Sequence, residues 1–246
     1  MRSAECGVRS AECGVRNAEC GTTFRIPHSA FFLIADRFDA FGPGTSMLNY
    51  RIFVAIAGLI LLVAALALAM AHLDRAIMDR LYHSPPALLP VMRVITLYGS
   101  WFVLLPAGVL GMFFALHHHR LDLAIRLGAG MLAGLFLTEG LKLAISRARP
   151  ELIERISVSG KSFPSGHALD SVVVWSFLAL LVWHLGYKQA WVRILYVIPV
   201  LAGWSRVYLG AHWPSDVLAG WGLGLLVLAA IAGSHRAADR AVTSDK

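Results

Sequence analysis

Long apolar segments alternate with short polar stretches from about residue 47 to the end of the chain. An apolar run of about 20 residues is long enough to cross a hydrocarbon core of roughly 30 Å as an α-helix. The first run contains no charged residue, and the second contains Pro106, which predicts a kink there. The pattern predicts an all-α integral membrane protein with six transmembrane helices, at about residues 52–71, 94–116, 127–141, 168–185, 194–204 and 217–232.

The composition supports a membrane protein and argues against two other classes. Of 246 residues, 57% are hydrophobic and only 15% are charged, and the mean hydropathy is +0.65. A soluble protein with very hydrophobic core helices is a poor fit to these values. The net charge of +7 raises the question of nucleic acid, but the arginines are scattered over loops instead of forming one patch. Basic loops lie well against anionic headgroups, so we expect the lipid bilayer, and not nucleic acid, as the partner.

An even number of spans places both termini on one side of the membrane. The loops on each side carry nine lysines and arginines. Three of the nine opposite the termini, Lys142, Arg149 and Arg206, are candidates for binding a ligand, which leaves six there. The excess of basic residues then predicts cytoplasmic termini.

The first 46 residues do not resemble a domain. The heptapeptides RSAECGV, RSAECGV and RNAECGT follow one another from Arg2 to Thr22 and offer no apolar seam for a coiled coil. Cys6, Cys13 and Cys20 are spaced too widely for a zinc site, and no signal-peptide core is present. We expect residues 1–46 to be a disordered tail, or the natural start to be Met47, and residues 47–246 to form the membrane domain.

The unusual polar residues fall in loops that share one face of the membrane, opposite the termini. Lys142 and Arg149 are seven residues apart, so on one helix they would share a face, about two turns or roughly 10 Å apart along the axis. Pro150 predicts that such a helix ends at Arg149. Both side chains would then reach one anionic ligand, although cations snorkelling at the end of a span explain this cluster better when it is taken alone.

A second cluster, PSGH at residues 164–167, opens the fourth span. Ser165 is a candidate N-cap, which leaves the amides of Gly166 and His167 among the unpaired donors of the first helical turn. Gly166 also lets an anion approach the backbone. A helix N-terminus of this kind binds phosphate, but an ordinary capped helix explains these four residues better when they are taken alone.

The third cluster adds a candidate nucleophile. Pro214 is placed to begin the sixth helix, with Asp216 in its first turn and His212 just before it. A carboxylate four residues after a histidine can accept a hydrogen bond from one ring nitrogen and leave the other free to attack phosphorus. A buried, satisfied histidine explains this cluster alone as well, but the three clusters together predict a phosphate site with a nucleophile.

The three clusters resemble the signature of the type 2 phosphatidic acid phosphatase superfamily, which shares its site with vanadium-dependent haloperoxidases. That signature reads K-x6-RP, PSGH and SR-x5-H-x3-D. The resemblance covers about residues 127–232, is highly specific, and says nothing of residues 1–46. All eleven fixed positions are matched in order, by Lys142, Arg149, Pro150, Pro164, Ser165, Gly166, His167, Ser205, Arg206, His212 and Asp216.

The resemblance implies a mechanism without metal or other cofactor. His212 would attack phosphorus to form a phosphohistidine, and Asp216 would orient it. His167 would protonate the leaving group and later activate water. The phosphate oxygens would be bound by Lys142, Arg149, Arg206, Ser165 and the amide of Gly166, and Ser205 is a signature position with a supporting role.

Two acids outside the signature are further candidates for supporting roles. Glu139 lies one turn before Lys142, and Asp170 lies one turn after His167. Carboxylates in or near a membrane are costly and are usually paired. We therefore expect one of them to neutralise Lys142 or another cation of the site.

Other motifs have structural explanations. The run His117 to His119 lies on the side of the termini, where an interfacial loop is a better explanation than a metal site. Gly130 with Gly134, and Gly220 with Gly224, have the small-residue spacing that permits close helix contact.

The predicted function is that of a metal-independent lipid phosphatase, and the resemblance implies a bacterial inner membrane with the site on its extracytoplasmic face. The enzyme would remove a phosphomonoester or diphosphate from undecaprenyl diphosphate, phosphatidylglycerophosphate or phosphatidic acid, which the sequence does not rank. A haloperoxidase that uses vanadate is one alternative, although those relatives are soluble. A non-catalytic lipid-phosphate binding or transport protein is another, although it would not need the intact nucleophile. No sequence feature indicates an oligomeric state.

Overall fold

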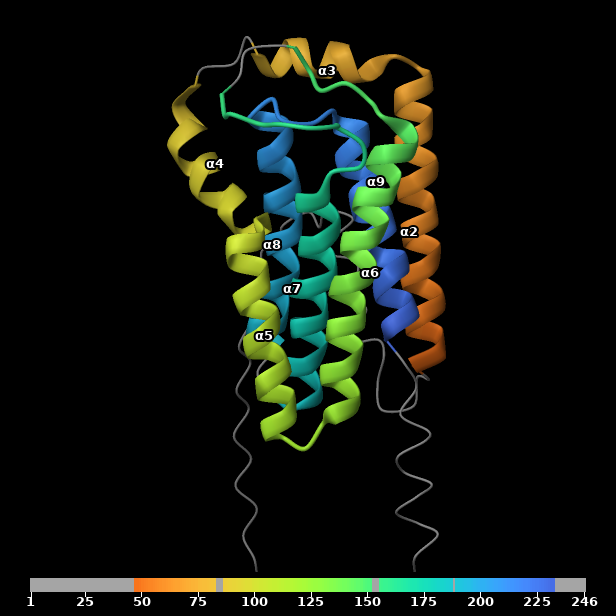
Figure 1. Ribbon diagram of the computed structural model, residues 1–246, viewed down its shortest axis with the longest axis vertical. Helices are drawn as coiled ribbons and strands as arrows, with labels where there is room; N and C mark the ends of the chain where they lie inside the picture. Colours follow the sequence, from red (N-terminus) through yellow and green to blue (C-terminus); the bar gives the residue numbers. More distant parts are fainter. Residues whose placement is uncertain (1–46, 83–85, 152–154, 188, 233–246) are drawn as a thin grey trace, which may run out of the picture.

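The computed structural model describes residues 47–82, 86–151, 155–187 and 189–232 (Figure 1). The predicted tail, residues 1–46, lies outside these ranges. The described residues form helices and no β-strand, which confirms the all-α prediction. In chain order the elements are α2 (Met47–Met70), α3 (Leu73–Tyr82), η1 (Pro86–Leu88), α4 (Leu89–Ile95), η2 (Thr96–Gly99), α5 (Trp101–His117), α6 (Leu121–Ile145), α7 (Gly166–His184), α8 (Gln189–Tyr208) and α9 (Pro214–Ile231).

Five helices of the described residues are long and apolar enough to cross a membrane. A sixth span results if the pair Leu89–Gly99 and Trp101–His117, bent by 43°, is counted as one span. Two spans differ most from their predicted lengths, because α6 runs from Leu121 to Ile145 and α8 from Gln189 to Tyr208. Charged residues in their end turns, such as Asp122, which pairs with Arg120 at 3.1 Å, interrupt the apolar pattern but not the helix. The predicted multi-pass architecture is confirmed.

The 43° bend in the second span lies at Gly99 and Ser100. Pro106, where the sequence predicted a kink, lies inside α5. Ser100 has an extended backbone (φ −84°, ψ 151°) and interrupts the helix. At Gly99 the chain packs directly on His167, because a Cβ there would lie 3.1 Å from the Cβ of His167. A contact with α7 therefore accompanies the bend.

Helix α3 was not predicted, because it is too short and polar to resemble a span. It lies across one end of the bundle, roughly perpendicular to the long helices (Figure 1). Its Met78 is fully buried in a cluster with Ala168, Val207 and Val217, from α7, α8 and α9. Helix α3 therefore covers that end of the bundle.

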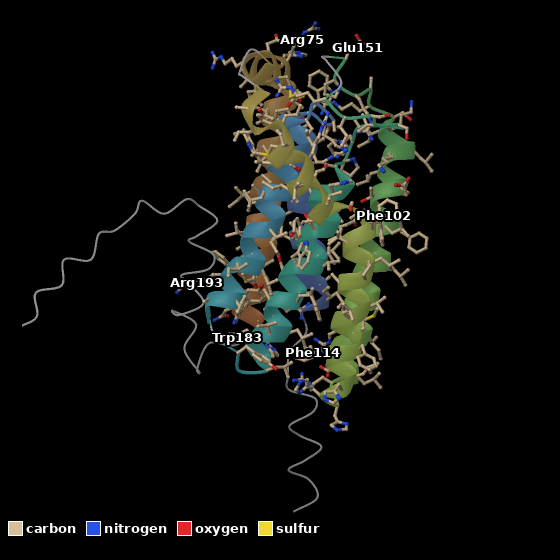
Figure 2. All side chains as sticks on the ribbon, turned by 90° about the vertical axis from the view of Figure 1, so that its left-hand side faces the viewer. Arg75, Phe102, Phe114, Glu151, Trp183 and Arg193 are labelled. Carbon is tan, nitrogen blue, oxygen red and sulfur yellow. The ribbon has the colours of Figure 1, made fainter. Side chains whose placement is uncertain are left out.

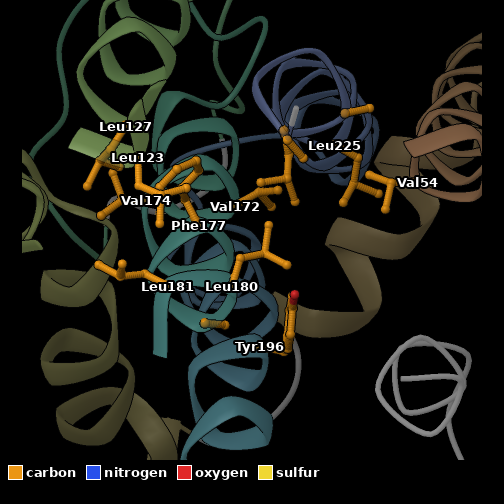
Figure 3. Packing of buried hydrophobic residues seen from close by; sticks show 14 of the residues in the cluster. Val54, Leu123, Leu127, Val172, Val174, Phe177, Leu180, Leu181, Tyr196 and Leu225 are labelled. Carbon is orange, nitrogen blue, oxygen red and sulfur yellow. The ribbon is translucent and has the colours of Figure 1, made fainter. Parts of the chain in front are cut away.

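The helices differ greatly in how much of their surface faces outward. Over an 18-residue membrane-spanning stretch of each helix, 67% of α7 is buried but only 17% of α2. Helix α7 lies between α6, α8 and α9, and its Val172, Val174 and Phe177 fill the core (Figure 3). Large apolar side chains elsewhere point outward, and Phe102 is 91% exposed (Figure 2). A continuous apolar exterior of this kind suits lipid contact.

Glycines bring α9 close to α7, as their spacing predicts. A Cβ at Gly220 would lie 2.7 Å from the carbonyl oxygen of Ser165, and one at Gly224 would lie 2.8 Å from that of Leu169. Side chains at these two positions would push the helices apart. The first turn of α7 is thus fixed against the backbone of α9.

The two ends of the bundle carry different elements. The start of α2 and the end of α9 lie at the end opposite α3, as expected for an even number of spans (Figure 1). The turn between α5 and α6, which includes His118 and His119, lies at that same end. The end beneath α3 receives the last turns of α6 and α8 and the first turns of α7 and α9.

Candidate active site

The predicted site residues meet at the end of the bundle beneath α3. Helices α7 and α9 begin there, so the positive ends of their dipoles and their unpaired amides face this region. Lys142 lies in the last turn of α6 and Arg206 in the last turn of α8. The segment between α6 and α7 crosses the same end and brings Arg149 and Ser162 into it.

Helix α6 extends past residue 141, the predicted end of the span, but does not reach Arg149. It stops at Ile145, and Ser146 has a left-handed backbone (φ 48°) at the C-cap. The prediction that Lys142 and Arg149 lie on one helix face was therefore wrong. Both still act on His167 electrostatically, so the loop brings Arg149 near the first turn of α7.

Arg149 holds the loop against His212. Its Nη1 donates to the carbonyl oxygen of Ala211 at 2.6 Å and lies 3.2 Å from Nε2 of His212. Its Nε and Nη2 donate to the carbonyl oxygens of Gly160 and Ser159 at 3.0 and 2.8 Å. Burial lowers the pKa of Arg149, and the charge of Asp216 opposes this effect. Carbonyl groups thus hold the guanidinium beside the imidazole.

The other two cations of the site have different partners. Arg206 is only 5% exposed, and its Nη1 donates to Oγ1 of Thr96 at 3.0 Å. Its Nε is buried without a hydrogen-bond partner among the described residues. Lys142 donates from Nζ to Oε1 of Glu139 at 2.7 Å. Thr96 was not found from the sequence, because an isolated threonine between two apolar helices carries no signal of its own.

The PSGH turn presents unpaired donors to the same space. Ser165 is the N-cap of α7, as predicted, but its side chain makes no capping hydrogen bond. Its Oγ is buried and has no partner within the described part of the chain. Its amide donates to the carbonyl oxygen of Asp216 at 3.1 Å, which ties the turn to α9. The amides of Gly166 and His167 lie in the first helical turn, where no intrahelical acceptor is available.

The hydrogen bonds of His212 define its tautomer. The side chain is 3% exposed, and its Nδ1 lies 2.7 Å from the carbonyl oxygen of Ser162. A carbonyl oxygen only accepts, so Nδ1 carries the proton and Nε2 keeps its lone pair. Burial lowers the pKa of His212 to about 4, against the effect of Asp216, and Arg206 and Arg149 lower it further. His212 is therefore neutral at pH 7 and nucleophilic at Nε2.

Asp216 does not accept the imidazole hydrogen bond that the sequence suggested. Its Oδ2 lies 3.7 Å from Nδ1 of His212, beyond hydrogen-bond distance. The hydroxyl of Ser162 donates to that oxygen at 2.5 Å, and the amide of Trp213 donates to it at 3.1 Å. Asp216 thus acts on the imidazole through Ser162 and through its charge.

Four polar residues besides Thr96 were missed from the sequence. Oδ1 of fully buried Asp216 accepts from Nη1 of Arg147 at 2.6 Å, and Nη2 of Arg147 donates to Asp74 at 2.7 Å. Ser215 and Ser162 complete this network. Arg147 lies inside the first cluster, but the sequence alone suggested only a loop cation, and nothing in it pairs Asp74 with Arg147.

The remaining candidates lie at the edge of the site. The hydroxyl of Ser205 donates to the carbonyl oxygen of Ala202 in its own helix at 2.6 Å. Asp170 is buried beneath the PSGH turn, and its Oδ1 has no partner among the described residues. Within the described ranges, no three His, Cys, Asp or Glu residues form a group that could hold a metal ion.

Comparisons with known proteins agree with this geometry. The sequence model of the PAP2 superfamily matches residues 123–240. The chain is 41% identical to phosphatidylglycerophosphatase B of Bacillus subtilis over 39% of its own length and 50% of the relative. It is 32% identical to undecaprenyl-diphosphatase of Sulfolobus acidocaldarius over 58% of its own length and 68% of the relative.

A solved structure extends the match beyond the signature. The crystal structure of a transmembrane PAP2-type phosphatidylglycerolphosphate phosphatase from Bacillus subtilis has a TM-score of 0.62 and 33% identity to this chain. The alignment covers 78% of this chain and 96% of the other. The matched sequence, the shared fold and the assembled signature residues show that the chain belongs to the PAP2 superfamily.

Proposed function

We propose that the protein hydrolyses a phosphomonoester or diphosphate of a membrane lipid through a phosphohistidine at His212. The observation that carries this proposal is a set of unpaired donors near the unprotonated Nε2 of His212, which also lies beside Arg149. Nε of Arg206 and Oγ of Ser165 are buried without partners among the described residues. Buried polar groups in proteins are nearly always paired, and a phosphate oxygen would satisfy these donors.

The geometry supports a mechanism in two steps. Nε2 of His212 attacks phosphorus while Lys142, Arg149 and Arg206 hold the non-bridging oxygens, and the bond to the leaving oxygen breaks as His167 protonates it. In the second step His167 takes a proton from water, the resulting hydroxide attacks phosphorus, and the bond to Nε2 breaks to release inorganic phosphate. The three cations stabilise the negative charge that develops in each transition state.

A lipid substrate is supported by the position of the site at the end of the apolar bundle. Leu143, beside Lys142 in the sequence, is 80% exposed on α6, so the outward surface is apolar up to the level of the site. A phosphate headgroup could reach the cations while its acyl chains stay among apolar side chains. The sequence match and the solved structure from Bacillus subtilis are both named for phosphatidylglycerophosphate, so this lipid is the first to test.

The proposal includes the membrane and the orientation. We place the protein in a bacterial inner membrane, with cytoplasmic termini and the site on the extracytoplasmic face. The count of basic residues in the loops supports this orientation. A reporter fused to the C-terminus, and active only in the cytoplasm, should be active, and an inactive reporter with normal expression would reverse the orientation.

Phosphate release from the purified protein in detergent tests the activity. Phosphatidylglycerophosphate, undecaprenyl diphosphate and phosphatidic acid should be compared, with and without EDTA. His212→Ala should lower turnover by at least about 10³-fold, since the nucleophile is lost, and EDTA should leave the wild type active. His117→Ala, at the other end of the bundle, is the matched control and should retain full activity.

Three results would contradict the proposal. Near-normal turnover in His212→Ala would show that the imidazole is not the nucleophile. Phosphate release that depends absolutely on Mg²⁺ would point to different chemistry. A wild-type protein that binds all three lipids but releases no phosphate would instead be a binding or transport protein.

A further inference from the structure

Arg147 makes a network of contacts that the proposed mechanism does not use. Its Nη2 donates to Oδ2 of Asp74 at 2.7 Å. Its Nη1 donates to Oδ1 of Asp216 at 2.6 Å and to Oγ of Ser215 at 2.7 Å. One guanidinium thus joins a carboxylate of α3 to a carboxylate of α9.

Asp74 is fixed as firmly as Asp216. It lies in the first turn of α3 and is only 4% exposed. Its Oδ1 accepts from the amide of Ser215 at 2.9 Å, and its Oδ2 accepts from the hydroxyl of the same residue. Because both oxygens are engaged, Asp74 attaches α3 to the first turn of α9.

The network reaches the imidazole through Ser162. The hydroxyl of Ser162 donates to Oδ2 of Asp216, and its carbonyl oxygen accepts from Nδ1 of His212 at 2.7 Å. Asp74, Arg147, Asp216, Ser162 and His212 therefore form one continuous chain of hydrogen bonds. Its residues come from α3, from the segment between α6 and α7, and from the start of α9.

The charges of this network favour a phosphorylated imidazole. Burial alone would lower the pKa of Arg147, but the carboxylates of Asp216 and Asp74 raise it, so the arginine stays charged. Two carboxylates and one guanidinium leave a net charge of −1. When Nε2 bonds to phosphorus while Nδ1 keeps its proton, the ring becomes cationic. A net negative charge, with Oδ2 of Asp216 3.7 Å from Nδ1, stabilises that cation.

Removing either Asp74 or Arg147 would change the net charge of the network. Without the carboxylate of Asp74, Arg147 and Asp216 would form a pair of zero net charge. Without Arg147, two buried carboxylates would lie close together, and one would take up a proton. In both cases Asp216 would lose its support and His212 would lose its orientation.

We propose that Arg147 and Asp74 are positioning residues for phosphoryl transfer, which hold Asp216 and, through Ser162, the attacking imidazole. The proposal rests on the proposed function, because it assigns these residues to the phosphohistidine step. Neither residue belongs to the set that binds the phosphate. A positioning role therefore predicts a slower chemical step with unchanged substrate affinity.

Single-turnover kinetics test this prediction. Full-length protein in detergent is mixed with ³²P-phosphatidylglycerophosphate, and labelled protein is trapped by rapid quenching. The first-order rate constant for labelling does not depend on the fraction of folded protein, so it separates positioning from stability. It should fall about 100-fold in Arg147→Met, the cost of misplacing a reacting group by about 1 Å, and about tenfold in Asp74→Asn. KM should change less than about threefold.

Matched variants on α3 and a conservative variant complete the experiment. Arg75→Met and Asp79→Asn remove one positive and one negative charge from α3, the helix that carries Asp74, and should label at the wild-type rate. Arg147→Lys keeps the charge but cannot donate to Asp74 and Asp216 from two separate nitrogens. Its rate constant should therefore lie between those of the wild type and Arg147→Met. It also carries the test if Arg147→Met does not fold.

The outcomes separate the two proposals. A wild-type protein that releases phosphate but forms no labelled histidine would overturn the phosphohistidine mechanism and the positioning role with it. Normal labelling of the wild type, with wild-type rate constants in Arg147→Lys and Asp74→Asn, would overturn the positioning role alone. A smaller labelled fraction with an unchanged rate constant would show that the network only stabilises the fold.

Discussion

Arg147 and Arg149 are separated by a single residue, yet their guanidinium groups lie in regions of opposite electrostatic character. Arg147 contacts the carboxylates of Asp74 and Asp216, so its charge is more than balanced. Arg149 contacts three carbonyl groups and the imidazole of His212, and it forms no ion pair among the described residues. The balanced arginine can support other residues, whereas Arg149 keeps an uncompensated positive charge that an anion can neutralise.

The same contrast extends to the surroundings of each arginine. On the side of Arg149, Arg206 also has a neutral partner, the hydroxyl of Thr96. On the side of Arg147, the polar atoms of Asp74 and Asp216 are all engaged. One region is therefore satisfied by the protein itself, and the other holds donors that a ligand must satisfy. Three measurements test this division.

The largest expected effect is that of Arg149→Met. It removes a donor from the phosphate oxygens, so kcat/KM should fall about 10³-fold, as when a donor to a developing oxyanion is lost. Inhibition by inorganic phosphate should also weaken at least about tenfold, whereas Arg147→Met should leave it unchanged. Lys161→Met, an exposed cation of the same loop, is the control. Equal weakening in both arginine variants would remove the distinction between the two regions.

A smaller effect concerns His212, which lies between the regions. Its pKa of about 4 in the folded protein is below the usual 6.5, so the unfolded chain binds more protons between these values. His212 therefore stabilises the fold above pH 6.5, and this contribution is lost as the pH falls toward 4. The wild type should lose about 3 kcal/mol relative to His212→Gln over this range. Melting temperatures of both proteins at several pH values measure this difference in stability. A difference that does not change with pH would contradict the lowered pKa of His212.

The smallest effect is expected for Glu139→Gln. The side chains of Lys142 and Glu139 are 24% and 58% exposed, and pairs this exposed contribute about 0–1 kcal/mol. Stability should therefore hardly change, but KM for a lipid phosphate should fall up to about threefold, because the charge of Lys142 is no longer compensated. Glu151→Gln, also at this end of the molecule, should leave KM unchanged. An increase in KM would show that Glu139 assists substrate binding.

The sequence predicted those site residues whose spacing along the chain forms a recognisable pattern. The apolar runs indicated the long helices, and the signature placed Lys142, Ser165, Arg206 and His212 on one face of the membrane. It did not predict the acceptor for His212, because that acceptor is a backbone carbonyl group, which any residue at position 162 would supply.

The pattern of residues along the chain could not predict contacts between distant segments. Asp74 lies 73 residues before Arg147, on a helix too polar to resemble a span. Helix α6 ends before Arg149 because Ser146 has a left-handed backbone, a conformation that serine adopts only occasionally. The bend at Gly99 coincides with packing against His167, whereas the sequence offered a proline as the obvious position.

The covering helix α3 has a consequence for exchanging parts between relatives. The family match, residues 123–240, contains all eleven signature positions but neither Asp74 nor Thr96. A chimera that transplants only the matched segment would carry the reactive groups without the upstream residues that hold Arg147 and Arg206. The natural unit for such grafts therefore begins no later than α3, about fifty residues upstream of where the family resemblance begins.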